Sequence, residues 1–166
     1  MDVQSTEGAG TTFTLYFPIT RKKTRRIPDE RHTRSYRGHG ETILVVDDVR
    51  EQREIATHML ERLGYVVTTV SSGEEAVAFL KDRSVDLVIL DMIMDPGIDG
   101  LETYQQILSI HPDQKAIIVS GFSETRRVKK LQRLGAGEYV KKPYLMEKLG
   151  SAVRDALDST SRINKN

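Results

Sequence analysis

The stretch DLVILDMIMDPGIDG, residues 86–100, decides the fold. Its first half is an uninterrupted apolar run that stops at Asp91, and its second half is a loop that contains Pro96 and Gly100. A short apolar run bounded by turn residues is typical of a strand buried on both faces, as in parallel sheets. We therefore predict a central strand over residues 86–90 that places a carboxylate at its carboxyl end.

From Glu41 onward, short apolar strands alternate with amphipathic helices. The predicted helices have apolar residues at three- to four-residue spacing, and Ser72 and Glu75 have the spacing of a capping box. The order β-α, repeated five times, indicates parallel strands joined by right-handed crossovers, hence an α/β fold with a doubly wound sheet between two helical layers. The predicted strands are 42–46, 65–70, 86–90, 115–120 and 138–141, and the helices lie around 49–64, 71–80, 100–110, 128–134 and 145–157.

Polar residues follow several of these strands. In such a sheet, ligands bind beyond the carboxyl ends of the strands, so the residues there are the first functional candidates. If the first and third strands are neighbours, three aspartates meet and repel one another unless a cation compensates. Mg²⁺ suits such a set, because it binds carboxylates, carbonyls and waters and leaves room for phosphate oxygens. The residues at these ends are Asp47, Asp48, Asp91, Ser120 and Lys142.

These side chains together predict phosphoryl transfer onto a carboxylate, with Asp91 as the nucleophile. Lys142 and Ser120 would supply a positive charge and a donor to the phosphoryl oxygens. Simpler interpretations exist for each residue alone. The pair at 47–48 could cap the next helix, Asp91 could belong to a turn, and Lys142 could be a solvated surface residue. Tyr139 could be a core residue of its strand.

Residues 41–157 resemble a response-regulator receiver domain. Four motifs occur in order at the expected strand ends: VVDD (45–48), LVILDMIM (87–94), IIVSG (117–121) and GAGEYVKKP (135–143). The resemblance implies a flavodoxin-like fold with a five-stranded parallel sheet in the order 2-1-3-4-5 and five flanking helices. It also implies a phosphorelay function, in which a phosphohistidine on a histidine kinase or a phosphotransfer protein is the donor.

The resemblance assigns a role to each residue of the acidic site. It implies that Asp91 accepts the phosphoryl group, that Asp48 binds Mg²⁺ directly, and that Asp47 acts mainly through a metal-bound water. The backbone carbonyl of Ile93 would be a further ligand of the metal. Asp91 would also contact the metal, which makes all four positions part of one site.

Further roles fall on the last two strands and their loops. The resemblance implies that Ser120 and Tyr139 form a switch, and that Lys142 contacts the phosphoryl group and precedes a cis peptide bond to Pro143. The fourth helix, fifth strand and fifth helix of the domain would form a face on which homodimers can assemble. We expect no nucleic acid partner and no membrane contact for this part of the chain.

One departure from the family pattern lies beside Asp91. The family has its loop proline four residues and its loop glycine eight residues after the acceptor, whereas Pro96 and Gly100 each come one residue later. The simplest account is a one-residue insertion around Asp95. This insertion puts the geometry of the Ile93 carbonyl in question.

Residues 1–19 precede the predicted domain and lack its alternation of strands and helices. Their last ten residues alternate apolar and polar side chains like a half-buried strand, but no partner strand is evident, so we expect no independent folding. The segment STEGAGTTFTLYFP (5–18) is similar to the end of a histidine-kinase ATP-binding domain. Together with the receiver motifs, it implies the C-terminal part of a hybrid sensor histidine kinase. The similarity is carried by Gly8, Gly10, Thr11 and Phe13.

The charge is distributed unevenly along the chain. Residues 21–37 hold eight basic and two acidic residues, whereas the whole chain has a net charge of only +1. These basic residues could contact nucleic acid or an anionic membrane. Because no nucleic-acid-binding motif accompanies them, we interpret 20–40 as a linker. The expected division is a kinase remnant over 1–19, the linker over 20–40, a receiver domain over 41–158 and a polar tail over 159–166.

The composition excludes several classes of protein. There is no cysteine, so disulfides and thiolate metal sites are absent, and no apolar run reaches the ~20 residues needed to cross a bilayer. We expect a cytoplasmic location, although a longer parent protein could be membrane-anchored. A haloacid-dehalogenase-type hydrolase would need an aspartate where Ile93 stands, and a flavodoxin-like electron carrier would need a phosphate loop where DDVRE (47–51) stands. A receiver that acts without phosphorylation, purely by protein interaction, is the remaining alternative.

Overall fold

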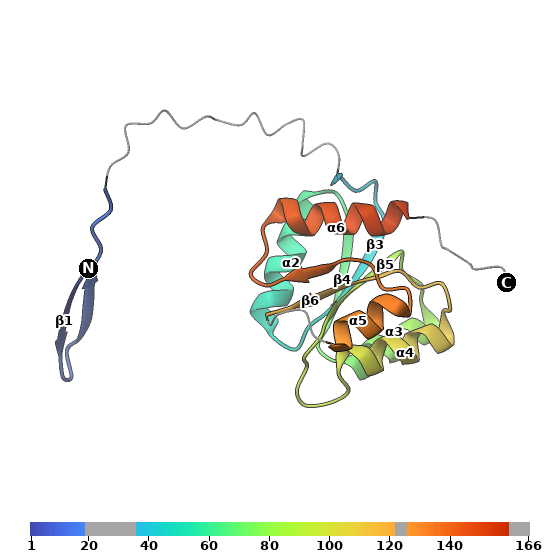
Figure 1. The fold of residues 1–166 in the computed structure, drawn as a ribbon, viewed down its shortest axis with the longest axis horizontal. Coiled ribbons are helices and arrows are strands. Elements are labelled where there is room, and N and C mark those ends of the chain that lie inside the picture. Colours follow the sequence, from blue (N-terminus) through green and yellow to red (C-terminus); the bar gives the residue numbers. More distant parts are fainter. Residues whose placement is uncertain (19–35, 122–125, 160–166) are drawn as a thin grey trace.

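The computed structural model describes residues 1–18, 36–121 and 126–159. These residues form a two-stranded antiparallel sheet near the N-terminus and a five-stranded parallel sheet in the rest of the chain (Figure 1). No helix within these ranges combines the length and the apolar character that crossing a bilayer requires. The prediction of a polar tail falls outside the described residues, apart from Ser159.

The parallel sheet has the predicted topology. Its strands lie in the order β4-β3-β5-β6-β7, which is the order 2-1-3-4-5 when the strands are counted from Thr42. All four neighbouring pairs are parallel, and β3 lies between β4 and β5. The carboxyl ends of β3 and β5 are therefore adjacent. The strands are β3 (Thr42–Val46), β4 (Val66–Val70), β5 (Leu87–Asp91), β6 (Ala116–Ser120) and β7 (Tyr139–Lys141).

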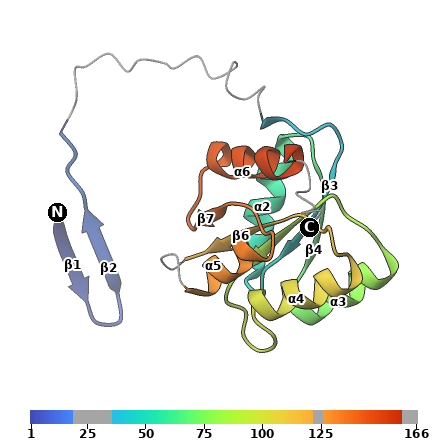
Figure 2. The same cartoon turned by 45° about the vertical axis from the view of Figure 1, so that its right-hand side comes forward.

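Helices cover both faces of this sheet (Figures 1 and 2). Side chains on β3 alternate between the two faces, so that Ile43 and Val45 pack with α2 and α6, whereas Leu44 and Val46 pack with α3, α4 and α5. The predicted three-layer α/β fold is confirmed. The helices are α2 (Arg50–Arg62), α3 (Gly73–Asp82), α4 (Gly100–Ile110), α5 (Arg126–Arg133) and α6 (Met146–Asp158).

The two central strands have no exposed face. Every residue of β5 and β6 is buried, as the continuous apolar runs predict. Truncation of such a residue, for example Leu90→Ala, costs on the order of 2–5 kcal/mol of stability. This rigid core holds the strand ends that carry the polar residues.

The predicted capping box at the start of α3 forms in one of its two contacts. Ser72 caps α3 and accepts a hydrogen bond from the Glu75 amide, but the Glu75 carboxylate binds the amide and hydroxyl of Ser71 rather than the Ser72 amide. The predicted capping box is therefore shifted by one residue at its second contact. Asp99 caps α4 by accepting from the Glu102 amide.

The N-terminal segment forms a hairpin, which corrects the expectation that no partner strand lies nearby. Strand β1 (Asp2–Thr6) pairs with β2 (Gly10–Thr14), and Val3 lies opposite Phe13. The partner strand escapes prediction because four of its five residues are polar and show no alternation of apolar side chains. The expected half burial is also wrong, since every residue of the hairpin strands is exposed.

The domain begins before the predicted boundary at Glu41. Tyr36 is only 6% exposed and belongs to the core between α2 and α6, where the Tyr65 hydroxyl donates to its carbonyl oxygen. The Gly38 amide donates to the Leu63 carbonyl at 2.8 Å. Residues 36–40 are thus part of the domain rather than of a linker. The sequence does not predict this, because Tyr36 is a single buried aromatic residue among basic residues and glycines.

Candidate functional site

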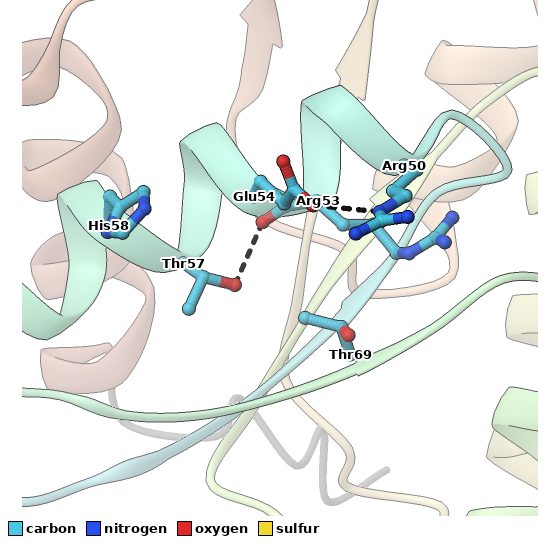
Figure 3. Close-up of a pocket in the computed structure, with 6 residues that line it drawn as sticks. All are labelled: Arg50, Arg53, Glu54, Thr57, His58 and Thr69. Atoms are coloured by element: carbon cyan, nitrogen blue, oxygen red, sulfur yellow. Dashed lines mark hydrogen bonds and ion pairs between the residues drawn. The ribbon is translucent and has the colours of Figure 1, made fainter.

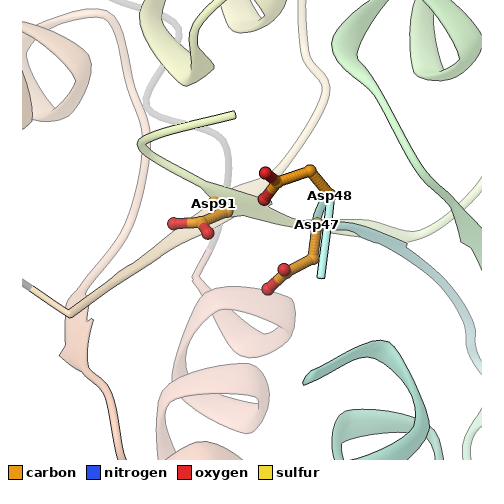
Figure 4. A group of neighbouring side chains, drawn as sticks. All are labelled: Asp47, Asp48 and Asp91. Atoms are coloured by element: carbon orange, nitrogen blue, oxygen red, sulfur yellow. The ribbon is translucent and has the colours of Figure 1, made fainter. Parts of the chain in front are cut away.

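Three carboxylates meet at the carboxyl edge of the sheet (Figure 4). Asp47 and Asp48 follow β3, Asp91 ends β5, and one carboxylate oxygen from each lies within 4.8 Å of those of the other two. Asp47 and Asp91 are buried, whereas Asp48 is exposed and leaves the cluster open to solvent. The simpler interpretation as a helix cap does not hold, because Val49 is the N-cap of α2 and makes no side-chain capping bond.

Lys142 joins two of these acids. Its Nζ donates to Asp47 Oδ2 at 2.5 Å and to Asp91 Oδ2 at 2.8 Å, and only 12% of its side chain is exposed. It is therefore not a solvated surface lysine. The peptide bond to Pro143 is cis, as expected, and the Lys142 amide donates to the Ser120 carbonyl, which ties the end of β7 to the end of β6.

The charge balance of the cluster suits a divalent cation. Burial raises the pKa of Asp91, the hydrogen bond and positive charge of Lys142 oppose this rise, and the charge of Asp47 adds to it. Three carboxylates and one ammonium leave a formal charge of about −2 at neutral pH. An all-oxygen donor set with one solvent-facing acid fits Mg²⁺, which prefers carboxylates and retains water ligands. Asp47, Asp48 and Asp91 are the residues that would hold it.

The predicted switch residues lie on neighbouring strands, Ser120 at the end of β6 and Tyr139 at the start of β7. Ser120 is buried, and the hydroxyl of Tyr139 donates to its carbonyl oxygen at 3.4 Å. The Tyr139 side chain is partly buried and packs against the core cluster on the α3–α5 face. Tyr139 therefore contributes to the core, and its hydroxyl also contacts Ser120, with which it is predicted to form a switch.

The loop after Asp91, residues 92–99, contains the predicted insertion. The Met92 amide donates to Asp91 Oδ1 at 2.7 Å, and the Ile93 amide lies 3.5 Å from the same oxygen. The Ile93 side chain is 52% exposed. Further along, the Asp95–Pro96 bond is cis, and the Asp95 amide lies 3.5 Å from Asp48 Oδ2. The loop therefore contacts two of the three acids through its backbone.

One residue that supports the site is not evident from the sequence. Arg53 Nη1 donates to the carbonyl oxygens of Asp47 and Asp48, so it holds the backbone that presents both acids. Arg53 also borders a surface hollow of about 270 Å³ between α2 and β4 (Figure 3). The buried Tyr144 has its pKa raised to about 12 by burial and by the charges of Asp47 and Asp91. An arginine on a helix carries no signal in a single sequence that it will bind the backbone of the preceding loop.

Comparison with known proteins identifies the domain. A family model described as "Response regulator receiver domain" matches residues 43–154. The DNA-binding transcriptional regulator NtrC of Azospirillum brasilense is 36% identical over 120 residues, which cover 72% of this chain and 25% of that protein. Sensor kinase CckA of Brucella abortus is 28% identical over 160 residues, which cover 91% of this chain and 17% of that protein.

Solved structures give the same result. The response regulator TrrA of Thermotoga maritima, in a complex with Mg²⁺ and BeF, is 37% identical with a TM-score of 0.63, over 70% of this chain and 98% of that one. A CheY-like receiver domain protein of Methanospirillum hungatei is 25% identical with a TM-score of 0.67, over 72% and 94% of the two chains. The aligned part spans only about a quarter of NtrC. The family match, the sheet order and the acidic cluster agree, and the chain belongs to the response-regulator receiver family of two-component systems.

Proposed function

We propose that this chain accepts a phosphoryl group on Asp91 from a phosphohistidine in the presence of Mg²⁺. The observation that carries the proposal is the position of Asp91 Oδ2, which lies 2.8 Å from Lys142 Nζ and within the cluster formed with Asp47 and Asp48. A carboxylate oxygen of Asp91 attacks phosphorus, the phosphorus–nitrogen bond of the donor breaks, and the released imidazole takes up a proton. The product is an acyl phosphate on Asp91.

The residues around Asp91 have distinct roles in this proposal. Lys142 is already oriented toward Asp91 and would move from the carboxylate to a phosphoryl oxygen without leaving the site. Bound Mg²⁺ would supply charge neutralisation, held by the three aspartates and the Ile93 carbonyl. Positioning and charge, rather than a general base, provide most of the rate, because a carboxylate nucleophile carries no proton to remove.

The phosphoryl group would change the domain through Ser120 and Tyr139. It adds a charge of about −1.5 to −2 next to the end of β6. The Ser120 hydroxyl would donate to a phosphoryl oxygen, and Tyr139, whose hydroxyl now contacts the Ser120 carbonyl, would move with it. The face formed by α5, β7 and α6 would then bind a partner or a second copy of the chain. This is a shift between two states biased by one local charge.

The wider context in our proposal is a hybrid histidine kinase. The alignment with sensor kinase CckA takes in 91% of this chain and so extends beyond the receiver match at residues 43–154. In this context residues 1–19 would end the ATP-binding domain, and the donor would be the phosphohistidine of the kinase or of a phosphotransfer protein. The reaction would take place in the cytoplasm, without nucleic acid.

Incubation with acetyl phosphate and Mg²⁺, followed by intact mass spectrometry, tests the proposal. We expect the wild-type protein to gain the mass of one phosphoryl group, and the gain to disappear with EDTA and in Asp91→Asn. Asp95→Asn is a matched control, because this acid lies in the neighbouring loop but outside the cluster. The same adduct on Asp91→Asn, or none on the wild type with Mg²⁺, would refute the assignment of Asp91.

A further inference from the structure

The loop after Asp91, in which we predict a one-residue insertion, is fastened to a neighbouring helix by one exposed glutamate. Glu74, in the first turn of α3, accepts a hydrogen bond from the Ile98 amide at 3.0 Å through Oε1. Hydrogen bonds from the amides of Glu74 itself and of Ile98 hold the pKa of the Glu74 carboxyl below its usual value. The carboxylate therefore stays charged and available as an acceptor at neutral pH.

The loop is shaped to receive this carboxylate. Gly97 has a φ of +128°, which side-chain-bearing residues rarely adopt, and a Cβ on it would lie 2.8 Å from both Glu74 carboxylate oxygens. Ile98 packs over the start of α3, because a Cβ on Gly73 would lie only 2.6 Å from Ile98 Cγ1. Two glycines on opposite sides of the contact thus allow the loop and the helix end to approach closely.

The other end of the same loop lies in the acidic cluster. The Met92 amide binds Asp91 Oδ1, and the Gly100 amide closes the base of the loop by donating to the Met92 carbonyl. The Asp95 amide lies 3.5 Å from Asp48 Oδ2. Between the base at Met92 and the Glu74 contact at Ile98, the described structure shows only two side chains that accept from a loop amide, Asp91 from Ile93 and Asp48 from Asp95, each at 3.5 Å.

We propose that Glu74 is a positioning residue for the metal site, which holds the 92–99 loop so that its backbone, including the Ile93 carbonyl, keeps the geometry needed to bind Mg²⁺. The inference rests on the proposed function. An extra residue gives the loop additional freedom, and a fixed point near its far end removes that freedom. Glu74 does not touch the metal or the phosphoryl group in this role.

The neighbouring glutamate provides a matched control. Glu75 is also exposed and also lies in the first turn of α3, but its carboxylate binds the Ser71 amide and hydroxyl and does not reach the loop. Glu75→Ala therefore removes a helix cap only, whereas Glu74→Ala removes the loop contact. Glu74→Gln keeps an amide oxygen that can accept from Ile98, so it should rescue the contact.

The test measures three quantities on the whole chain: the exchange rate of the Ile98 amide without metal, the Kd for Mg²⁺, and the Tm. We expect Glu74→Ala to speed Ile98 exchange and to raise the Kd for Mg²⁺ about tenfold, which is typical when a group that orients metal ligands is lost. Glu74→Gln should stay close to the wild type in both. Glu75→Ala should lower the Tm and leave the Mg²⁺ Kd unchanged.

The outcomes separate this inference from the proposed function. If the wild type binds Mg²⁺ and Glu74→Ala binds it equally well, the positioning role is wrong while the phosphoacceptor assignment stands. An equal loss of affinity in Glu75→Ala would likewise overturn it, because the effect would then come from the end of α3. If the wild type shows no saturable Mg²⁺ binding, both the inference and the proposed function fail.

Discussion

Asp91 combines two opposing requirements at the scale of a single residue. For the proposed function, it must be buried enough to exclude competing water and charged enough to act as a nucleophile. Burial raises the pKa of this carboxyl, while the Lys142 ammonium at 2.8 Å acts in the opposite direction. The folded domain therefore holds an acid that is less stable in its charged form than it would be in water.

The first prediction concerns the cost of this buried charge. Because the pKa is higher in the folded than in the unfolded state, stability is lost as pH rises from the unfolded value of about 3.8 through the folded value. Asp91→Asn should therefore be more stable than the wild type at pH 7 in EDTA, by about 1 kcal/mol, while Lys142 keeps Asp47 as its partner. Urea unfolding measures this gain, which should shrink toward pH 4; a less stable Asp91→Asn at pH 7 would contradict it.

The second prediction concerns the exposed acid of the cluster. Asp48→Asn should weaken Mg²⁺ binding at least about tenfold, since it removes a carboxylate that would contact the metal. Asp113→Asn removes an equally exposed charge from the loop that precedes β6 and should change little. The rise in Tm with added Mg²⁺ reports the Kd. Equal Mg²⁺ affinities in the two variants would contradict this prediction, because the affinity would then depend only on the net charge of the domain.

At the scale of elements, the residues before β3 act as part of the core. Tyr36 packs so closely on α6 that a Cβ on Gly150 would lie 2.6 Å from its ring. Glu41 accepts from the His39 amide and from Arg154 of α6. Burial alone would raise the pKa of Glu41, but these hydrogen bonds lower it to about 2.

The third prediction follows from this lowered pKa. A carboxyl whose folded pKa of about 2 lies below its unfolded value of 4.5 stabilises the fold above pH 4.5, and this contribution is lost as pH falls toward 2. Glu41→Gln should therefore lower the free energy of unfolding at pH 7 by about 1–2 kcal/mol. Glu54→Gln breaks an exposed pair with Arg50 and should cost less than about 0.5 kcal/mol. Urea titrations at pH 7 and pH 3 measure the difference in the free energy of unfolding between each variant and the wild type. This difference should be smaller at pH 3 than at pH 7 only for Glu41→Gln.

The elements also show what a sequence can and cannot predict. The continuous apolar runs predict β5 and β6, and the helical spacing of apolar residues predicts α3 and α4. All four elements are observed, because burial on one or two faces dictates each pattern. Four strand-end residues, Asp47, Asp48, Asp91 and Lys142, follow from the strands alone, since parallel strands bring their carboxyl ends together. These residues are predictable because their partners lie at the corresponding ends of neighbouring parallel strands.

The features that were missed depend on contacts between unlike elements. Strand β1 has one apolar residue and gives no alternation, although it pairs fully with β2. The contacts of Arg53 with the carbonyls of the acidic pair, and of Glu74 with Ile98, join a helix side chain to a loop backbone. Loop backbone positions are set by tertiary packing and closure, which no local pattern encodes.

At the scale of the whole molecule, the chain divides at Tyr36 and not at Glu41. The strands of the hairpin are exposed throughout, whereas Tyr36 is 6% exposed and Gly38 and Gly40 donate hydrogen bonds to Leu63 and Gly64. The first group of residues adds nothing to the core of the parallel domain. The second group closes one end of that core.

Two truncations test this division and form the last prediction. Removal of residues 1–35 should leave the Tm of the domain unchanged, because Tyr36 and its contacts remain. Removal of residues 1–40 should lower the free energy of unfolding by about 2 kcal/mol, because the stabilisation from burying one large apolar side chain is lost. Tyr36→Ala in the whole chain should have a similar effect. If both truncations destabilise the domain equally, residues before Tyr36 contribute to its stability. If neither truncation does, the burial of Tyr36 does not stabilise the domain. Because Tyr36 packs on α6, which is part of the proposed partner face, only the longer truncation is also expected to alter binding there.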